Sequence, residues 1–348
     1  MKFDFIIGNP PYQDETIGAN ETYAPPIYHR FLDEAYKVGD AVELVHPARF
    51  LFNAGSTPKE WNRKMLRDPH FKVLLYEADV SKVFPNTNIN GGIVISYRDI
   101  RKEFGAIGVF TQFSELDSIR KKVCNHKCFH SFKQIVASAY SYHLTQRLYE
   151  DHPELMGRLS KGHEYDLKSN IFELMPEVFL SEKETNDYIQ ILGRKNNARA
   201  TMWIKRQYIV GPKSLNKYKL FLAGADGAAG SIGKPKPARI TGVPSIGSIE
   251  MGSTESFLSI GCFDSEEIAN NALKYIKTKF ARTLLSILKV TQAITPEKWA
   301  YVPLQDFTLA SDIDWTASIP DIDKQLYAKY GLDDTEIEFI ETHVKEMK

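Results

Sequence analysis

The segment Asn9-Pro10-Pro11-Tyr12, directly after the apolar run Phe3 to Gly8, is the feature that most constrains this chain. Such a run predicts a buried strand, and the prolines end it, because proline fixes φ at about −65° and biases the preceding residue toward extended backbone. We therefore expect the Asn9 side-chain oxygen and the Pro10 backbone carbonyl to face one cleft. Two acceptors there can bond both hydrogens of a planar NH2 group and leave its lone pair free to attack a methyl donor. Tyr12 offers a flat face for the ring that carries the amine.

The same tetrapeptide also fits an ordinary exit from a strand into a turn, since prolines are common in turns. The run and the tetrapeptide together, from Phe3 to Tyr12, resemble the catalytic motif of amino-methyltransferases that use S-adenosylmethionine. Asparagine as its first residue is similar to the adenine-N6 branch and to enzymes that methylate glutamine amides. The cytosine-N4 branch usually carries serine at that position.

Length and composition are those of an ordinary globular protein. With 348 residues, 43% hydrophobic and 25% charged, the chain has room for one large domain or two ordinary ones. The formal net charge is 0, and three cysteines, Cys124, Cys128 and Cys262, do not make a disulfide framework. We therefore expect a reducing, cytoplasmic location. Nothing in the sequence resembles a signal peptide or the ~20 apolar residues of a membrane span, so we expect no membrane partner.

The first third of the chain alternates between predicted strands and helices. Apolar or β-branched runs predict four strands, at Phe3–Ile7, Ala41–Val45, Val73–Tyr76 and Gly92–Tyr97. Apolar residues at helical spacing predict helices from Tyr28 to Ala35 and from Lys59 to Leu66. This order predicts an α/β fold, a partial doubly wound (Rossmann-like) sheet that is parallel or mixed. The first strand reads as covered on both faces.

Two further segments follow in the order that the resemblance implies. Residues 47–51 (Pro-Ala-Arg-Phe-Leu) resemble the family's next block, and Phe84-Pro85-Asn86 with the strand after it resembles the block beyond. The resemblance implies that Phe84 packs on the target base opposite Tyr12, because chemistry on a base needs it out of the stack. The alternative is a core aromatic beside a turn. Residues 1–122 are thus expected to form the C-terminal half of a methyltransferase catalytic domain.

The cofactor-binding elements of this family are not found in the sequence. The resemblance implies S-adenosylmethionine as cofactor, held by a glycine-rich loop after one strand and an acidic residue after the next. The only glycine-rich stretch, Gly224–Gly233, is not G-x-G-x-x-G, and it runs into Lys234-Pro235-Lys236-Pro237, which cannot begin a long helix. It is not a P-loop either, since Pro235 stands where serine or threonine is required. We therefore expect a second chain or a missing N-terminal region to supply the cofactor half.

The middle of the chain is strongly basic. Between Ile191 and Ile240 the only acidic residue is Asp226, and Trp203, Tyr208 and Tyr218 are interspersed. Clustered charge of this kind favours phosphate binding, so we predict double-stranded DNA as partner. The alternative is a solvated basic face. The predicted DNA-binding residues are Arg194, Lys195, Arg199, Lys205, Arg206, Lys213, Lys217, Lys219, Lys234, Lys236 and Arg239.

The remaining segments complete the predicted organisation. Thr254 to Pro303 resembles the target-recognition domain of restriction–modification enzymes, with a scaffold helix from Ser265 to about Lys289, so residues 123–310 are expected to form a target-recognition domain. Residues 311–348 form an acidic tail with two predicted helices, Ile322 to Tyr330 and Thr335 to the end. Asp333 or Asp334 is a candidate cap for the second.

Two other activities are not expected. Cys124, His126, Cys128 and His130 lie within seven residues, too close together for an ordinary zinc site, so we predict no metal. The only nuclease-like Glu-x-Lys triplet is Glu346-Met347-Lys348 at the C-terminus, so we predict no DNA cleavage.

Taken together, the chain resembles adenine-specific (N6) DNA methyltransferases of restriction–modification systems, of the Eco57I/TaqI type with the gamma order of motifs. The resemblance covers nearly the whole chain, but its most specific motif is four residues long. It implies methyl transfer from S-adenosylmethionine to a flipped adenine. Two alternatives stay open, an inactive DNA-binding specificity module or subunit and a protein glutamine-amide methyltransferase.

Overall fold

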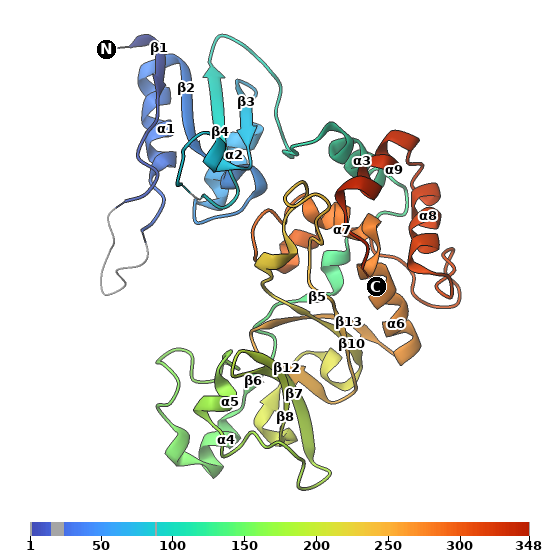
Figure 1. Ribbon diagram of the computed structural model, residues 1–348. Coiled ribbons are helices and arrows are strands. Elements are labelled where there is room, and N and C mark those ends of the chain that lie inside the picture. Colours follow the sequence, from blue (N-terminus) through green and yellow to red (C-terminus); the bar gives the residue numbers. More distant parts are fainter. Residues whose placement is uncertain (1, 15–23, 88, 348) are drawn as a thin grey trace. The chain divides into compact units, whose positions relative to one another are not determined.

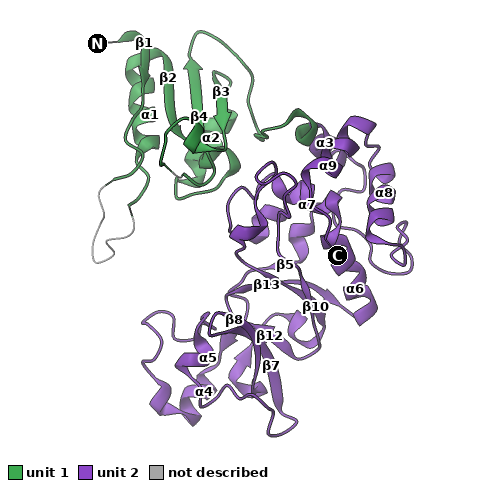
Figure 2. Ribbon diagram, viewed as in Figure 1, with its two compact units in different colours: residues 1–117 green, residues 118–348 purple. Residues whose placement is uncertain are grey.

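The computed structural model describes residues 2–14, 24–87 and 89–347, and it divides into two compact units, residues 1–117 and 118–348 (Figures 1 and 2). Both units mix helices with small sheets, so the α/β character predicted for the chain is confirmed. Helix α3 (Ser114–Cys124) crosses the boundary between them.

Unit 1 is built on one four-stranded sheet in the order β1-β2-β4-β3. Strand β1 runs parallel to β2, whereas β4 is antiparallel to both β2 and β3, so the sheet is mixed. The four predicted strands and two predicted helices are all present. Their bounds are β1 Phe3–Gly8, α1 Tyr28–Val38, β2 Gly39–Pro47, α2 Lys59–Arg67, β3 Phe71–Glu77 and β4 Ile93–Asp99.

One face of this sheet is fully packed. Alternate residues of β2 and β4, such as Val42, Leu44 and Val94, are buried, as strand geometry requires when one face meets the core. Helices α1 and α2 supply Tyr28 and Trp61, whose rings meet edge to face with centroids 6.1 Å apart. This packing holds the strand ends of unit 1 in place.

Strand β1 lies at the edge of the sheet, and its outward face is open. Phe3 is 49% exposed, Phe5 50% and Ile7 72%, and these residues share one face because they are two apart in a strand. The prediction that this strand is covered on both faces is therefore wrong. Although its residues are apolar, β1 has a neighbouring strand on one side only within the described part of the chain.

Unit 2 contains a four-stranded sheet in the order β11-β10-β13-β5, a three-stranded sheet β12-β7-β8 and a two-stranded pair β6-β9. Its other elements are short helices. The bounds are β5 Val136–Ala137, β6 His143–Leu144, α4 Gln146–Asp151, α5 Ile171–Leu174, β7 Tyr188–Lys195, β8 Ala198–Lys205, β9 Ile209–Val210, β10 Tyr218–Ala223, β11 Ser245–Gly247, β12 Met251–Ser253, β13 Phe257–Phe263, α6 Glu266–Lys277, α7 Lys279–Ser286, α8 Ile319–Lys329 and α9 Asp334–His343.

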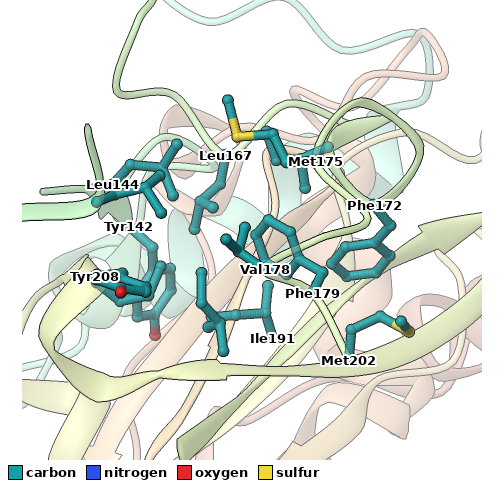
Figure 3. Packing of buried hydrophobic residues seen from close by; sticks show 14 of the residues in the cluster. Tyr142, Leu144, Leu167, Phe172, Met175, Val178, Phe179, Ile191, Met202 and Tyr208 are labelled. Carbon is teal, nitrogen blue, oxygen red and sulfur yellow. The ribbon is translucent and has the colours of Figure 1, made fainter. Parts of the chain in front are cut away.

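An apolar core in unit 2 is formed by the β7–β8 hairpin and the segment that precedes it. Figure 3 shows Ile191 and Met202 of the two strands packed among Phe172, Val178 and Phe179. Each of these side chains is less than 10% exposed. Burial thus fixes the base of the hairpin. The position of the base in turn determines the direction in which the far end of the hairpin points.

Two predictions about the C-terminal helices have different outcomes. The helix expected from Ser265 to Lys289 is two helices, because Thr278 has extended backbone and its side chain accepts a hydrogen bond from Ala281 N to begin α7. Both tail helices are present, and Asp333 caps α9 with the reciprocal bond from Glu336 that defines a capping box, as predicted. No helix in the described ranges is both long and apolar enough to span a membrane.

Candidate functional site

The strand arrangement of unit 1 brings the predicted motifs to one edge of the sheet. Because β1 and β2 are parallel, Asn9 and Arg49 both follow the carboxyl end of their strands. Strand β4 is antiparallel, so its first residues lie at this same edge, where the Ala48 N–H donates to the Gly92 carbonyl over 3.0 Å. Ligands of open α/β sheets bind at such an edge, in the crevice outside the carboxyl ends of the strands.

The Asn-Pro-Pro-Tyr segment itself is accessible. Asn9 and Pro11 are exposed, whereas Pro10 and Tyr12 are half-buried. The carbonyl of Tyr12 accepts a hydrogen bond from Ile27 N over 3.1 Å, which fastens the segment to the start of α1. The motif is therefore held by its backbone, and its asparagine residue is exposed and accessible to a ligand.

A cavity of about 290 Å³ lies beside Tyr12. It is lined by residues from the two strand ends, the start of α1 and the loop before α2. These are Tyr12, Gln13, Ala24, Pro26, Tyr28, Pro47, Arg49, Gly55, Ser56, Thr57 and Ile89. Among these described residues there is no carboxylate and no imidazole, so the lining offers donors, amide and backbone acceptors, and aromatic faces.

The hydroxyl of Tyr12 is buried and has no hydrogen-bond partner among the described residues. Burial raises its pKa, and the nearby Asn9 side chain offsets part of that rise. Burial also raises the pKa of Tyr28 to about 12, against opposing effects of Thr57 and Arg49. Both phenols are thus neutral donors at neutral pH, and that of Tyr12 is available to a bound group.

Arg49 joins the cavity to the loop before β4. Its Nε donates to the Asn90 carbonyl over 2.5 Å, and a Cβ at Gly91 would lie 2.9 Å from its Cγ. Arg49 lies in a segment that resembles a family block, but the sequence predicted no role at the site for Arg49 or for Tyr28. The signal that could have identified Arg49 is its place just beyond the end of the second parallel strand.

The other predicted stacking residue, Phe84, is half-buried in the turn after the 3-10 helix Val80–Lys82. Its N–H donates to the Val80 carbonyl over 2.8 Å. Phe84 is not among the residues that line the cavity beside Tyr12. The sandwich of a base between Tyr12 and Phe84 therefore stays a prediction.

A buried histidine supports the cavity from the packed face of the sheet. His46 is fully buried, its Nε2 lies 2.8 Å from Ser96 Oγ, and its ring stacks on Tyr28 with centroids 5.4 Å apart. Burial lowers its pKa to about 4. His46 is thus neutral at pH 7 and fixes the ring of Tyr28 that lines the cavity.

In unit 2 one of the eleven predicted DNA-binding residues is not at the surface. Lys219 is fully buried in β10, where its ammonium donates to the carbonyls of Leu215, Lys217 and Ser248 over 2.7–3.2 Å. The prediction that Lys219 contacts DNA is therefore wrong. It satisfies backbone acceptors inside the fold, a role that charge counting along the sequence cannot reveal.

Several of the other basic side chains are occupied within the fold. Lys217 pairs with Asp264 at 2.6 Å, and Arg239 pairs with Asp226 at 2.7 Å. Arg206 donates to the Ile209 carbonyl over 2.9 Å. The exposed cations of the set are Arg194, Lys195, Arg199, Lys213, Lys217, Lys234 and Lys236.

The described residues do not fit S-adenosylmethionine. The glycine-rich stretch forms a single 3-10 turn, Gly227–Ala229, capped by the Asp226 side chain, and no long helix follows it. Within the described ranges, no further strand lies beside β1 whose loop would face the motif. Nor do any three His, Cys, Asp or Glu side chains within the described ranges form a group that could hold a metal ion.

Comparison with known proteins gives one family match. Residues 1–84 match the family model described as Eco57I restriction-modification methylase. This match confirms the predicted resemblance to restriction–modification methylases. The matched stretch contains the Asn-Pro-Pro-Tyr segment, the Pro47–Leu51 block and Phe84, while no curated protein matches the chain.

Two solved structures show a distant likeness. The type IIG restriction endonuclease BpuSI is 11% identical, with a TM-score of 0.35 over 90% of this chain and 47% of its own. The type IIL restriction-modification enzyme MmeI, solved in complex with DNA, is 10% identical, with a TM-score of 0.40 over 97% of this chain and 56% of its own. The chain thus spans about half the length of either enzyme, and likeness at this level carries no conclusion about activity.

Proposed function

We propose that this chain carries the base-handling and DNA-binding parts of a DNA adenine-N6 methyltransferase of a restriction–modification system. The observation that carries the proposal is the Asn-Pro-Pro-Tyr segment at the carboxyl end of β1, accessible and directly beside the cavity lined by Tyr12. The family match over residues 1–84 supports the methylase part.

In this proposal a flipped adenine enters the cavity beside Tyr12. The Asn9 side-chain oxygen and the Pro10 carbonyl accept the two hydrogens of its exocyclic amine, and the ring lies on Tyr12. The buried Tyr12 hydroxyl supplies a donor for a ring nitrogen or for the Asn9 amide. Phe84 is proposed as a second stacking residue, reached when the turn after residues 80–82 closes on the base.

Double-stranded DNA is the proposed partner of unit 2. Seven of the predicted basic residues are exposed there, and cations clustered along the sequence bind phosphate by releasing counterions. Affinity is therefore expected to fall steeply with salt. Residues 123–310 are proposed as the target-recognition part.

We further propose that another segment completes the site at the free edge of β1. The exposed apolar face of Phe3, Phe5 and Ile7 and the unpaired edge both require cover, and an added parallel strand provides it. Such a strand also creates the switch point at which open α/β sheets bind ligands, next to Asn9. A second chain or a region outside this sequence would then hold the methyl donor, which the family implies is S-adenosylmethionine.

The unpaired edge of β1 also supports a second candidate function. Because no described residues fit the cofactor, the chain alone can act as a DNA-binding specificity module without activity of its own. The open edge of β1 is the observation that favours this alternative. The hypothesis of a protein glutamine-amide methyltransferase has no such support, since that activity does not require the exposed cations of unit 2.

The test is transfer of labelled methyl from S-adenosylmethionine to mixed-sequence duplex DNA by the chain together with the polypeptide that completes its site at β1, with the Asn9→Ala variant beside it. Digestion to nucleosides then identifies the labelled base. We expect label on N6 of adenine, reduced on the order of 100-fold or more by Asn9→Ala, by analogy with the loss of one preorganised polar group.

Other outcomes separate the alternatives. No incorporation together with salt-sensitive DNA binding would favour the specificity module. Label on cytosine, or on protein glutamine when DNA is omitted, would contradict the adenine assignment. Equal incorporation by Asn9→Ala would remove the motif from the mechanism.

A further inference from the structure

The β7–β8 hairpin ends in a tight turn beyond the rest of its sheet. Its two-residue loop, Asn196-Asn197, has φ angles of 50° and 62°, as a type I′ hairpin turn requires. Strand β12 pairs with β7 only as far as Leu192, so the last residues of β7 have a single partner strand. Figure 1 shows the two strands running on from β12 to this turn.

The tip of the hairpin carries cations that oppose one another. Arg194 lies directly across from Arg199, and Lys195 is next to the turn. All three are exposed, and no ion pair of theirs is found among the described residues. Like charges directly opposite in a sheet destabilise it, so this arrangement is unfavourable unless an anion comes between or beside them.

The carboxylate that contacts the turn bonds to backbone. Glu173 uses Oε1 to accept the backbone N–H of Asn196 over 3.0 Å, which fixes the turn. Arg194 Nη1 donates to the Asn197 carbonyl at 3.4 Å, and the Arg199 guanidinium lies over the Phe257 ring, 5.3 Å from its centroid. The two guanidinium groups are therefore oriented, but they keep most of their donors free.

The base of the hairpin is rigid. Ile191 and Met202 are buried in the core of unit 2, and Leu180 and Trp203 exchange two backbone hydrogen bonds of 2.8 Å along the outer edge of β8. A ribbon held in this way presents its tip at a fixed angle. Little ordering is then needed when the tip meets a ligand.

We propose that the tip of the β7–β8 hairpin enters the major groove of duplex DNA, where Arg194 and Arg199 read base edges. The major groove admits a two-stranded β-ribbon, and arginine makes two parallel bonds to guanine O6 and N7. Asn197 at the turn has the side-chain type that pairs with adenine. This inference rests on the proposed DNA-binding function and assigns sequence reading to these residues, whereas the other exposed lysines contact phosphate.

The test begins with selection of bound sequences from a random duplex library by the wild-type chain. Affinities for the selected duplex and for the random pool are then compared in a variant with both Arg194→Lys and Arg199→Lys. These substitutions keep the charge but remove the planar fork of donors. The matched control is Lys213→Gln, which removes an exposed charge of the same basic segment away from the hairpin.

We expect the double lysine variant to lose at least about fivefold of its preference for the selected duplex, at guanine positions, with unchanged affinity for the random pool. Lys213→Gln should weaken both affinities equally. An unchanged preference in the double variant overturns base reading by the hairpin while leaving DNA binding intact. If the wild-type chain binds no duplex at any salt concentration, the proposed function and this inference both fail.

Discussion

Strands β1 and β7 are similarly apolar, yet the apolar side chains of β7 are buried and those of β1 are mostly exposed. In β7, Ile189 and Ile191 are buried because β8, β12 and the preceding segment surround them. In β1, Phe5 and Ile7 are at least half exposed, and among the strands that the structure describes only β2 lies beside them. An apolar strand therefore predicts that a neighbouring element covers it, but it does not indicate which polypeptide supplies that element. The strand that lacks its cover is the one that ends in the motif.

The largest expected effect is a matched pair of substitutions in these two strands. Ile191→Ala should lower the free energy of unfolding of unit 2 by about 2–5 kcal/mol, since it leaves a cavity in a closed core. Ile7→Ala should change that of unit 1 by no more than about 0.5 kcal/mol, since its side chain is 72% exposed. Urea unfolding followed by a probe in each unit measures both. A comparable loss at Ile7 would show that β1 is already covered in solution.

The stability of unit 1 should fall in acid, because its packed face contains a buried histidine. Burial holds the pKa of His46 at about 4, below its ordinary value of 6.5, so the folded state resists protonation. The resulting stability is present in full above pH 6.5 and is lost as the pH falls through 4, which amounts to at most about 3 kcal/mol.

The measurement for His46 is the pH dependence of unfolding of the wild type and of His46→Gln. The wild type should show a steeper loss between pH 6.5 and 4 than the variant. Equal slopes would mean that the buried imidazole is not the group that titrates.

A smaller effect is expected at Lys219, which separates structural cations from those that meet DNA. Lys219→Met leaves three backbone carbonyls without their donor, and we expect a loss of about 1–3 kcal/mol in the free energy of unfolding. Affinity for duplex DNA, measured by fluorescence anisotropy under conditions where the variant is folded, should not change. A salt-dependent loss of affinity in folded Lys219→Met would show that Lys219 contacts DNA after all.

Local patterns predicted the elements of unit 1 well, because strand runs, helical spacing and their order are properties of neighbouring residues. Burial of β1 was predicted wrongly, because burial depends on which elements pack beside the strand, and the local apolar pattern does not identify them. The break at Thr278 was missed because the helical stripe continues through it, while the Thr278 side chain begins a new helix.

The site could be located from sequence only in part. The Asn-Pro-Pro-Tyr segment stands out on its own, whereas Arg49 and Tyr28 become visible as cavity residues only when the strand ends converge. Charge counting found the basic segment, but it could not separate buried Lys219 from exposed Arg194 and Arg199, since that depends on the register of distant strands.

The central claim is that unit 1 handles the base and unit 2 binds the DNA. The most direct measurement scores Asn9→Ala and the double variant Arg194→Gln with Arg199→Gln for methyl incorporation, in the presence of the polypeptide that completes the site at β1, and for duplex affinity. We predict that Asn9→Ala abolishes incorporation with affinity unchanged, and that the arginine variant loses affinity and loses incorporation only as far as DNA occupancy falls. Full incorporation by Asn9→Ala, or unchanged affinity in the arginine variant, would contradict that division.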